Sequence, residues 1–372
     1  MKIEQIEIRE IQMPLTSFFE TSFGRTTLRR IILIRVFADG VIGYGEATSP
    51  EGPFYNHEST ETAWHILKDF VIPPILNSNI NHPLGVVPLL KRIRGHNMAK
   101  AALETALWDL YSRQLEKPLY QVLGGTQKSL DCGVSIGIQE SIGELLAKID
   151  RELQAGYQRI KIKIKPGWDV KVVQEVRKHF QNIVLMCDAN SAYKLQDLDH
   201  LKALDDFELL MIEQPLAWND ILDHVQLQKS LKTPICLDES ILDAEDARKA
   251  IEAGACQIIN IKLGRVGGYS EAIKVHDVCH SHQIPVWCGG MLESGIGRAH
   301  NIILSTLKNF SLPGDVSASK RYFHQDIVDP RIDVDLSGKI HVRPQLGIGF
   351  QPNMSRIKEV TVRTESFRPK QS

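Results

Sequence analysis

The first 46 residues alternate apolar and polar positions with the period of two that is typical of β-strands. Three strand-like runs stand out, at residues 2–11 (KIEQIEIREI), 30–36 (RIILIRV) and 42–47 (IGYGEA). The ADGV sequence between the second and third runs predicts a hairpin turn. The stretch PLTSFFETSFGRT, residues 14–26, is expected to form a polar-aromatic loop. From about residue 60 to 125 the apolar spacing is helical.

Beyond the two glycines at 124 and 125, short β-rich runs alternate with amphipathic, helix-like segments. The seven runs are CGVSIGI (132–138), RIKIKI (159–164), NIVLMCDA (182–189), FELLMIEQP (207–215), TPICLDE (233–239), CQIINIK (256–262) and IPVWCGG (284–290). Strand-helix alternation predicts parallel strands, and seven such units favour a (β/α) barrel. An open doubly wound sheet is the alternative, and the lack of a G-x-G-x-x-G sequence after the first run disfavours it.

The predicted fold class is therefore α/β, a modified (β/α)7β TIM barrel with an α+β capping domain. Residues 1–125 would form the capping domain, and residues 126–321 the barrel that carries the site. After the barrel, IDVDL, GKIHV and IKEVTVRT again alternate like strands. We expect this tail, about 322–372, to return to the capping domain.

Charged residues recur at the ends of five consecutive barrel runs. They are Lys163, Asp188, Glu213, Asp238 and Lys262, separated by 25, 25, 25 and 24 residues, with Lys161 two positions before the first. A strand, a helix and two short loops add up to about that length. Each charged group is therefore predicted to lie at the carboxyl end of its strand, the face on which barrel active sites form.

Single residues of this kind have simpler explanations. A lone Asp at a strand end is more often a helix N-cap, and a lone Lys after an apolar run usually extends its amine to solvent. Three carboxylates at one barrel mouth, however, would repel one another unless a cation or a proton held them together. Hard oxygen ligands without His or Cys favour Mg²⁺, with Mn²⁺ as an alternative. Asp188, Glu213 and Asp238 are the predicted metal ligands.

The lysines on either side of the carboxylates suggest the reaction. Lys163 and Lys262 are expected to face one another across a bound substrate, where the metal and each other's charge should lower a lysine pKa toward neutrality. Lys161, in phase with Lys163, should also point into the barrel and orient its neighbour or contact a metal ligand. This set suggests removal of a proton next to a carboxylate, with the metal and a protonated Lys262 stabilising the enediolate.

Composition narrows the class of protein further. The 44 Lys and Arg against 45 Asp and Glu leave a net charge of -1, which argues against a nucleic-acid-coating protein. The sequence has no run of 18 uncharged apolar residues and its N-terminus lacks the apolar segment of a secretory signal, so no membrane association is expected. The six cysteines form no CxxC pair, so buried free thiols and a cytoplasmic location are expected.

These residues together resemble the enolase superfamily, which uses a Lys or His base with Mg²⁺, and in particular its muconate-lactonizing subgroup with lysines on both faces of the substrate. The subgroup's K-x-K, D-x-N, E-Q-P and D-E-S motifs are matched at residues 161–163, 188–190, 213–215 and 238–240. The passage ALWDL…KPLYQVLGG (106–125) is similar to the family's connection from cap to barrel. The likeness extends over the whole chain and implies a Mg²⁺-dependent enzyme.

Within the subgroup, RIKIKIKPGWD (159–169), IEQPLAWND (212–220) and WCGGMLESGIGRAHN (287–301) most resemble the o-succinylbenzoate synthase / N-succinylamino acid racemase branch. The resemblance implies syn dehydration of 2-succinyl-6-hydroxy-2,4-cyclohexadiene-1-carboxylate in menaquinone biosynthesis, with N-succinylamino acid (N-acylamino acid) racemisation as a second activity. Lys163 would be the base and then the acid that helps hydroxide leave. Lys262 would stabilise the enediolate, or serve as the opposite-face acid/base in racemisation. Arg265 matches an arginine of members that also racemise N-succinylamino acids.

The remaining site candidates surround this centre. Cap loops at 16–25 and 50–56 are expected to close over the barrel mouth, and GGMLESG (289–295) follows the seventh run. The candidate substrate-binding residues are Lys161, Ser135, Arg265, Met291, Ser294, Phe19, Ser22 and Tyr55. Simple packing or solvation is the alternative for each cap residue. Asn190, Glu239 and Glu293 are expected to hold the ligating and substrate-binding groups in place from behind.

Several other functions are compatible with the same residues. A muconate-type cycloisomerase and a dipeptide epimerase are alternatives within the subgroup, although Asp315 is followed by Ser317 where dipeptide epimerases usually carry Asp-x-Asp. A Schiff-base aldolase using Lys163 or Lys262, and a metal-dependent carboxylate-binding protein without catalysis, are alternatives from other classes. The expected partner is a small-molecule carboxylate, and a homo-oligomer is expected because members of the family commonly assemble.

Overall fold

The capping domain is built on a four-stranded antiparallel sheet. The structure is a computed structural model and describes residues 1–369. The sheet has the order β15–β1–β2–β3, with strands at Ile3–Thr21 (β1), Gly24–Ala38 (β2), Val41–Ala47 (β3) and Thr361–Phe367 (β15). Ile6 and Ile8, two positions apart in β1, are fully buried in the core of the cap. The predicted period of two therefore gives this sheet its buried face.

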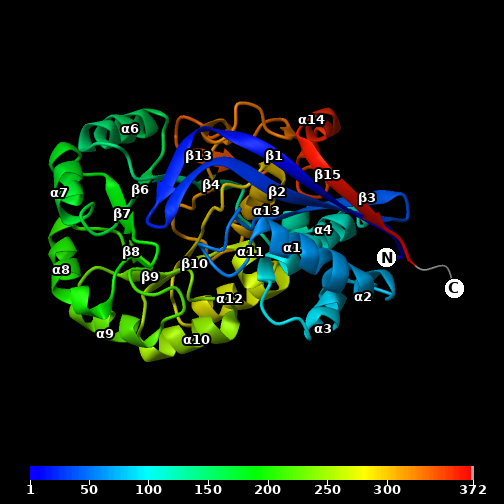
Figure 1. Cartoon of the computed structure of the whole chain (residues 1–372), viewed down its shortest axis with the longest axis horizontal. Helices are drawn as coiled ribbons and strands as arrows, with labels where there is room; N and C mark the ends of the chain where they lie inside the picture. The colour runs from blue at the N-terminus through cyan, green and yellow to red at the C-terminus, as the bar shows by residue number, and fades with distance from the viewer. Residues whose placement is uncertain (370–372) are drawn as a thin grey trace.

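The hairpin of β1 and β2 is longer than the sequence suggests. The loop expected at residues 14–26 is wrong, because strand pairing resumes at Phe19–Thr26 and continues to Thr21–Gly24 after an irregularity that begins at Pro14. Proline and clustered aromatic residues hide the alternation there, but pairing across the hairpin still satisfies the backbone groups. In Figure 1 this blue hairpin extends from the cap across the barrel.

Helices cover the apolar face of the cap sheet. They are α1 (Thr60–Ile66), the π-helical turn η1 (Leu67–Val71), α2 (Ile72–Leu76), the 3-10 turn η2 (Pro83–Gly85), α3 (Val86–Leu90), α4 (Asn97–Gln114) and α5 (Leu119–Val122). The longest, α4, packs very closely on β3. A Cβ atom at Gly43 or Gly45 would lie 2.1 Å from the backbone oxygen of Ala106 or Ala102, respectively. Glycine at both positions is therefore required for this contact.

Seven parallel strands form the barrel sheet in the order β11–β10–β9–β8–β7–β6–β5. They are Gly133–Ile136 (β5), Arg159–Lys163 (β6), Val184–Asp188 (β7), Ile212–Glu213 (β8), Ile235–Leu237 (β9), Ile258–Ile261 (β10) and Val286–Cys288 (β11). Each strand lies within one of the seven predicted runs. The repeating apolar runs thus identify the barrel strands correctly.

Helices alternate with these strands and lie outside them, several in the arc visible in Figure 1. They are α6 (Ile142–Gln154), α7 (Val170–His179), α8 (Leu198–Lys202), α9 (Leu222–Ser230), α10 (Ala244–Ala253), α11 (Leu263–Val266), α12 (Tyr269–Ser281) and α13 (Gly295–Leu304), with 3-10 turns η3 (Leu195–Asp197) and η4 (Ala203–Phe207) flanking α8. Strands and helices together bury one continuous apolar core.

Residues 309–315 close the ring between β11 and β5. Isolated parallel bridges join Phe310 to Val286 on one side and Gly314 to Cys132 on the other. The Asp315 N–H donates to the Cys288 carbonyl at 2.8 Å, which fixes the end of the segment against β11. The predicted fold, a modified (β/α)7β barrel with an α+β cap, is confirmed.

The predicted tail, about 322–372, divides between the two parts of the molecule. After the turn η5 (Ser319–Arg321), β12 (Val328–Asp329) pairs with β14 (Gln351–Pro352), and β13 (Lys339–His341) pairs with β4 (Ser129–Asp131) at the start of the barrel. Only β15, after α14 (Met354–Glu359), joins the cap sheet, where it pairs with β1. Residues 370–372 of the tail lie outside the described part of the chain.

Two buried glutamates of the cap bind the amino ends of barrel helices. Glu46, in β3, accepts hydrogen bonds from the backbone N–H groups of Ser294 (3.0 Å) and Gly297 (2.9 Å) at the start of α13. Glu104, in α4, accepts from the N–H of Tyr269 at the start of α12 at 2.8 Å. Free N–H groups and the helix dipole favour a carboxylate at such a position. These contacts fix the cap against the barrel.

Two further expectations from the sequence concern the cysteines and membrane-spanning helices. All six cysteines are buried and free, as the sequence predicts. Among residues 1–369, no helix is both long enough and apolar enough to cross a bilayer.

Candidate active site

The charged residues singled out in the sequence lie at the carboxyl ends of adjacent barrel strands. Lys161 and Lys163 are in β6, Asp188 ends β7, Glu213 ends β8, and Asp238 and Lys262 directly follow β9 and β10. The strand register places Asp188 between Lys163 on one side and Glu213 on the other. All six residues are at most 6% exposed. Burial makes each charge depend strongly on its partners.

Lys161 connects three carboxylates with its ammonium group. Its Nζ lies 2.6 Å from Asp315 Oδ2, 2.9 Å from Glu213 Oε2 and 3.3 Å from Asp188 Oδ2. The Nζ also stands 4.7 Å from the ring centroid of Trp287. Burial alone would lower the pKa of Lys161, but the charges of Asp315, Glu213 and Asp188 outweigh burial and raise it. Lys161 is therefore a permanent cation that holds the carboxylates in place.

Lys163 has fewer anionic partners than Lys161. Its Nζ donates to Asp188 Oδ2 at 2.5 Å and to Asn190 Oδ1 at 2.7 Å. Asn190 in turn donates through Nδ2 to Glu239 Oε1 at 3.1 Å, so two of the three predicted supporting residues lie next to this lysine. Burial, reinforced by the charge of Lys161, lowers the pKa of Lys163.

Lys262 stands four strands away from Lys163, with the strands that carry the carboxylates between them. Its Nζ donates to Asp238 Oδ2 at 2.7 Å and to the Tyr55 hydroxyl at 3.3 Å. Arg265 also pairs with Asp238. Burial would lower the pKa of Lys262, but Tyr55 and Glu213 outweigh burial and raise it.

The three carboxylates have the donor chemistry of a Mg²⁺ site, but they do not meet as the sequence suggests. Among residues 1–369, no three His, Cys, Asp or Glu side chains are close enough together to hold a metal ion. Lys161 draws Asp188 and Glu213 to one side, whereas Lys262 and Arg265 draw Asp238 to the other.

The chemistry of this donor set nevertheless fits a divalent cation. The candidate ligands are buried carboxylates on neighbouring strands, which are hard oxygen donors. Their mutual repulsion is evident in Glu213, whose pKa is raised to about 7 by burial and by the charge of Asp188. A divalent cation among them would relieve that repulsion.

A small cavity of about 90 Å³ opens onto both lysines. Lys163, Lys262 and Asn190 line it from the barrel, and Met291 lines it from the loop after β11. Phe19, from the β1–β2 hairpin, and Tyr55, from the loop before α1, line it from the cap, together with the buried Arg29. Cap and barrel thus share the walls of one site, as the positions of the predicted loops suggest.

Several predicted substrate contacts are engaged elsewhere. Ser22 donates to the Asn190 carbonyl at 3.0 Å and so attaches the hairpin tip to the barrel. Ser294 is fully buried, caps α13 and bonds to Glu46. Glu293, which the sequence predicts as a supporting residue, accepts from the N–H of Met291 at 2.6 Å and so holds the loop. Neither serine lines the cavity beside the lysines.

Sequence reasoning missed three residues of this site. Asp315 is the anchor of Lys161, and its own pKa is lowered because Lys161 and Arg159 outweigh its burial. Asn260 donates to Glu213 Oε1 at 2.7 Å and lies two positions before Lys262, so the strand period could have identified it. Arg29 binds Glu51 at 2.6 Å below the cap loop. Asp315 stands where dipeptide epimerases usually carry Asp-x-Asp, but nothing in the sequence indicates its contact with Lys161, and no pattern around Arg29 indicates a site residue.

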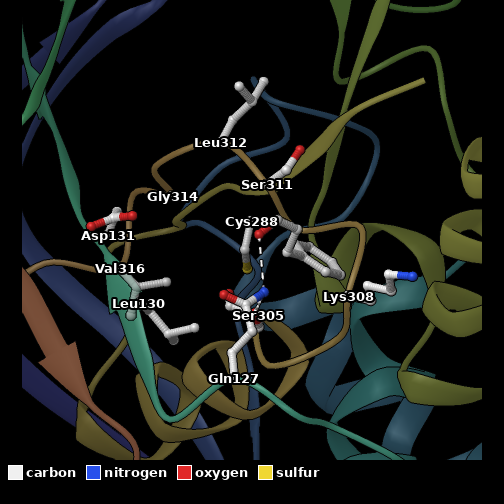
Figure 2. A pocket seen from close by; sticks show the side chains of 11 residues that line it. Gln127, Leu130, Asp131, Cys288, Ser305, Lys308, Ser311, Leu312, Gly314 and Val316 are labelled. Carbon is white, nitrogen blue, oxygen red and sulfur yellow. Dashed lines mark hydrogen bonds between the residues drawn. The ribbon is translucent and has the colours of Figure 1, made fainter. Parts of the chain in front are cut away.

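A separate cavity of about 140 Å³ lies away from the lysines, between the start of the barrel and the segment after α13 (Figure 2). Gln127, Asp131, Ser305 and Lys308 are among the side chains that line it. Gln127 Nε2 donates to the backbone carbonyls of Ser305, Leu307 and Phe310, so its amide is committed to holding this turn. Contacts of this kind support the barrel rather than a reaction.

Two family descriptions match the chain, one for each part of the fold. Residues 4–124 match the N-terminal domain of mandelate racemase / muconate lactonizing enzymes, and residues 144–356 match the enolase C-terminal domain-like family. A muconate-lactonizing-type cap and an enolase-like barrel are the two parts that the structure contains.

Characterised proteins and solved structures agree with this match. The chain is 51% identical to o-succinylbenzoate synthase of Geobacillus stearothermophilus over 97% of its own length and 96% of that protein, and 46% identical to N-succinylamino acid racemase of Thermus thermophilus over 97% and 98%. An enolase superfamily member from Listeria innocua superposes with a TM-score of 0.95 at 40% identity over both whole chains. A dipeptide epimerase from Cytophaga hutchinsonii, complexed with Mg and a dipeptide, superposes with a TM-score of 0.91 at 25% identity over 98% and 100%. The chain belongs to the enolase superfamily of divalent-metal-dependent enzymes.

Proposed function

We propose that this enzyme is a Mg²⁺-dependent o-succinylbenzoate synthase that also racemises N-succinylamino acids. Both reactions begin with removal of a proton next to a carboxylate. The observation that carries the proposal is the placement of Lys163 and Lys262 on opposite sides of three buried carboxylates, with both lysines lining one cavity. One relative named o-succinylbenzoate synthase, at 51% identity, and one named N-succinylamino acid racemase, at 46%, each matched along nearly the whole chain, support this assignment.

Asp188, Glu213 and Asp238 are the proposed Mg²⁺ ligands, with Mn²⁺ as the alternative ion. A divalent ion bound there would supply Lewis-acid stabilisation of the negative charge that develops on the substrate carboxylate. Asn260 donates to Glu213, and the backbone N–H of Asn190 donates to Asp188 Oδ1 at 3.0 Å, so both orient ligands from behind; Glu239 in turn accepts from the Asn190 side chain.

Lys163 is proposed to take the α-proton in the dehydration and to return a proton to the leaving hydroxide. Lys262, paired with Asp238 and Tyr55, would stay protonated and stabilise the enediolate from the other side. In racemisation the same two amines would act as acid and base on opposite faces. Arg265 contacts Asp238, beside Lys262, and would influence how the proton is exchanged on that face.

The rival functions are less well supported by specific contacts. Asp315 is committed to Arg159 and Lys161, at 2.8 Å and 2.6 Å, so it is not available to hold the ammonium group of a dipeptide. A Schiff-base aldolase would need an amine that forms a covalent adduct, which borohydride reduction in the presence of substrate would trap. A muconate-type cycloisomerase is excluded or supported by assaying muconate directly.

The test is a parallel assay of the purified enzyme with the cyclohexadiene substrate and with both enantiomers of N-succinyl-phenylalanine. We expect turnover of both substrate types with Mg²⁺, complete loss after EDTA treatment, and recovery when Mg²⁺ or Mn²⁺ is restored. Activity that persists after removal of all divalent ions would contradict the proposal, as would ligand binding without any solvent deuterium entering the α position.

The six buried thiols suit a reducing compartment, and we propose that the enzyme acts in the cytoplasm. A homo-oligomeric state remains a prediction, which light scattering of the purified protein would check.

A further inference from the structure

A second cavity adjoins the candidate active site on the far side of Phe19. Its volume is about 270 Å³, and it lies between the β1 irregularity, helix α6, the turn η5 and strand β5. Phe19 lines both this cavity and the one that opens onto the two lysines, so the ring forms a shared wall. A substrate held beside Lys163 would reach the second cavity by extending past Phe19.

The lining of this cavity carries an excess of positive charge. Lys148, Arg151 and Arg321 line it, with Glu152 as the one acidic side chain among its lining residues. Arg321 uses Glu152 as its counterion, at 2.9 Å. Within residues 1–369, the half-buried Lys148 and the exposed Arg151 form no ion pair, so two positive charges remain without a direct counterion. Burial, and then the charge of Arg321, lower the pKa of Lys148, which reflects this crowding of cations.

Ser135 connects the cationic cavity with the barrel mouth. Its residue pairs in register with Lys161, so the two side chains share the inner face of the barrel. Its carbonyl accepts a hydrogen bond from Arg321 at 3.3 Å. Its hydroxyl is buried and, in the described part of the chain, has no hydrogen-bond partner. Buried polar atoms normally have partners, so this hydroxyl is available to a ligand.

We propose that this cationic cavity, formed by Lys148, Arg151 and Arg321 with Ser135 at its entrance, binds the second, distal carboxylate of a dicarboxylic substrate whose first carboxylate lies at the lysines. This inference rests on the proposed function and adds the basis of its substrate preference. A distal anion would supply the missing counterion for the two unpaired cations and a partner for the Ser135 hydroxyl. A substrate with a neutral carboxamide arm of the same shape could still hydrogen-bond to Ser135 but would supply no counterion for the two cations.

The test compares two substrates that differ only in charge at the end of the acyl arm. N-succinyl-phenylalanine ends in a carboxylate, and N-succinamoyl-phenylalanine ends in a carboxamide of the same shape. We expect the parent enzyme to favour the first by roughly tenfold or more in kcat/KM. In the Lys148→Gln/Arg151→Gln variant this preference should fall to within about twofold, through a loss on the succinyl substrate alone.

The controls separate this inference from the proposed function and from general electrostatics. Lys171→Gln/Lys178→Gln removes two charges from the exposed face of the neighbouring helix α7 and should leave the preference unchanged. N-acetyl-phenylalanine, which has no distal group, should be racemised equally by the parent and the cavity variant, which also shows that the variant is folded. A preference that is absent in the parent, or unchanged in the cavity variant, would overturn the subsite and leave the proposed reaction intact. Failure of the parent to exchange the α-proton of any N-acylamino acid would instead contradict the proposed function itself.

Discussion

Three lysine amines share one site, and their neighbours assign them different tasks. Lys161 is surrounded by three carboxylates and stays charged, whereas Lys163 has one carboxylate and one amide oxygen as partners. Lys262 is held between Asp238 and the phenol of Tyr55. Because their neighbours differ, two similar amines on opposite sides of a substrate need not carry the same charge.

Tyr55 offers a test of this arrangement, because its hydroxyl is bonded to Asp238 at 2.9 Å and to Lys262. Tyr55→Phe keeps the ring but removes both bonds to charged groups. We expect kcat to fall by roughly tenfold, with little change in melting temperature. Steady-state kinetics and thermal unfolding measure the two effects, with Tyr44→Phe in the cap strand β3 as the control. An unchanged kcat would show that Tyr55 does not position Lys262.

The charged residues at the carboxyl ends of the barrel strands could mostly be predicted from the sequence, because they recur once in each strand-helix unit. The residues that pair with them could not be predicted in this way. Asp315 reaches Lys161 from a segment with no strand pattern and 154 positions later in the chain, so no local periodicity connects them. The sequence also suggests that the three carboxylates converge, but in this structure Asp188 and Glu213 share Lys161, whereas Asp238 pairs with Lys262.

Strand β3 and helix α4 pack very closely against each other in the cap. Gly45 lies where any side chain would collide with the Ala102 carbonyl, and relief would require one of the two elements to move. The alternation of β3 predicts a strand, but only the packed structure shows that its glycines face a helix backbone. The hairpin at 14–26 was missed for a related reason, since pairing across strands is not visible in one strand's sequence.

Gly45→Ala should therefore destabilise the protein by about 2 kcal/mol or more, because a backbone oxygen cannot move aside as a flexible side chain can. The matched control is Gly143→Ala in α6, where the nearest atom to a new Cβ is Ser141 Oγ at 3.9 Å. That change should be neutral or stabilising by roughly 0.5 to 1 kcal/mol, since alanine favours a helix. Chemical denaturation of both variants measures the difference, and equal stabilities would contradict the proposed close packing.

Glu46 makes the junction of cap and barrel sensitive to pH. Burial raises its pKa to about 7 from an ordinary value of 4.5, even though the start of α13 donates hydrogen bonds to it. Between these values the folded protein binds a proton that the unfolded chain has released, so this contribution to stability is full below pH 4.5 and is lost as pH rises through 7. Relative to Glu46→Gln, which cannot titrate at this position, the parent should therefore lose roughly 3 kcal/mol of its free energy of unfolding between pH 4.5 and 8. Unfolding curves across that range, with exposed Glu144→Gln as control, measure it, and a constant difference would contradict this account.

Neither the cap nor the barrel forms the site alone. The barrel supplies the lysines and carboxylates, while the cap supplies Tyr55 and Phe19, and Ser22 attaches the hairpin tip to the Asn190 carbonyl. The cap is also tied to the barrel by Glu46 and Glu104 at two helix starts. The order of motifs in the sequence predicts both parts and their joint site, whereas the division of the tail between them emerges only from long-range pairing.

The proposed mechanism requires Lys163 and Lys262 to exchange the same α-proton from opposite faces. The decisive measurement is solvent deuterium incorporation into each separate enantiomer of N-succinyl-phenylalanine by the parent, Lys163→Ala and Lys262→Ala with Mg²⁺ present. We expect the parent to exchange both enantiomers, and each variant to lose exchange of one enantiomer by about 100-fold or more, a different enantiomer for each lysine. Loss of both enantiomers in one variant together with parent-like exchange of both in the other would contradict it.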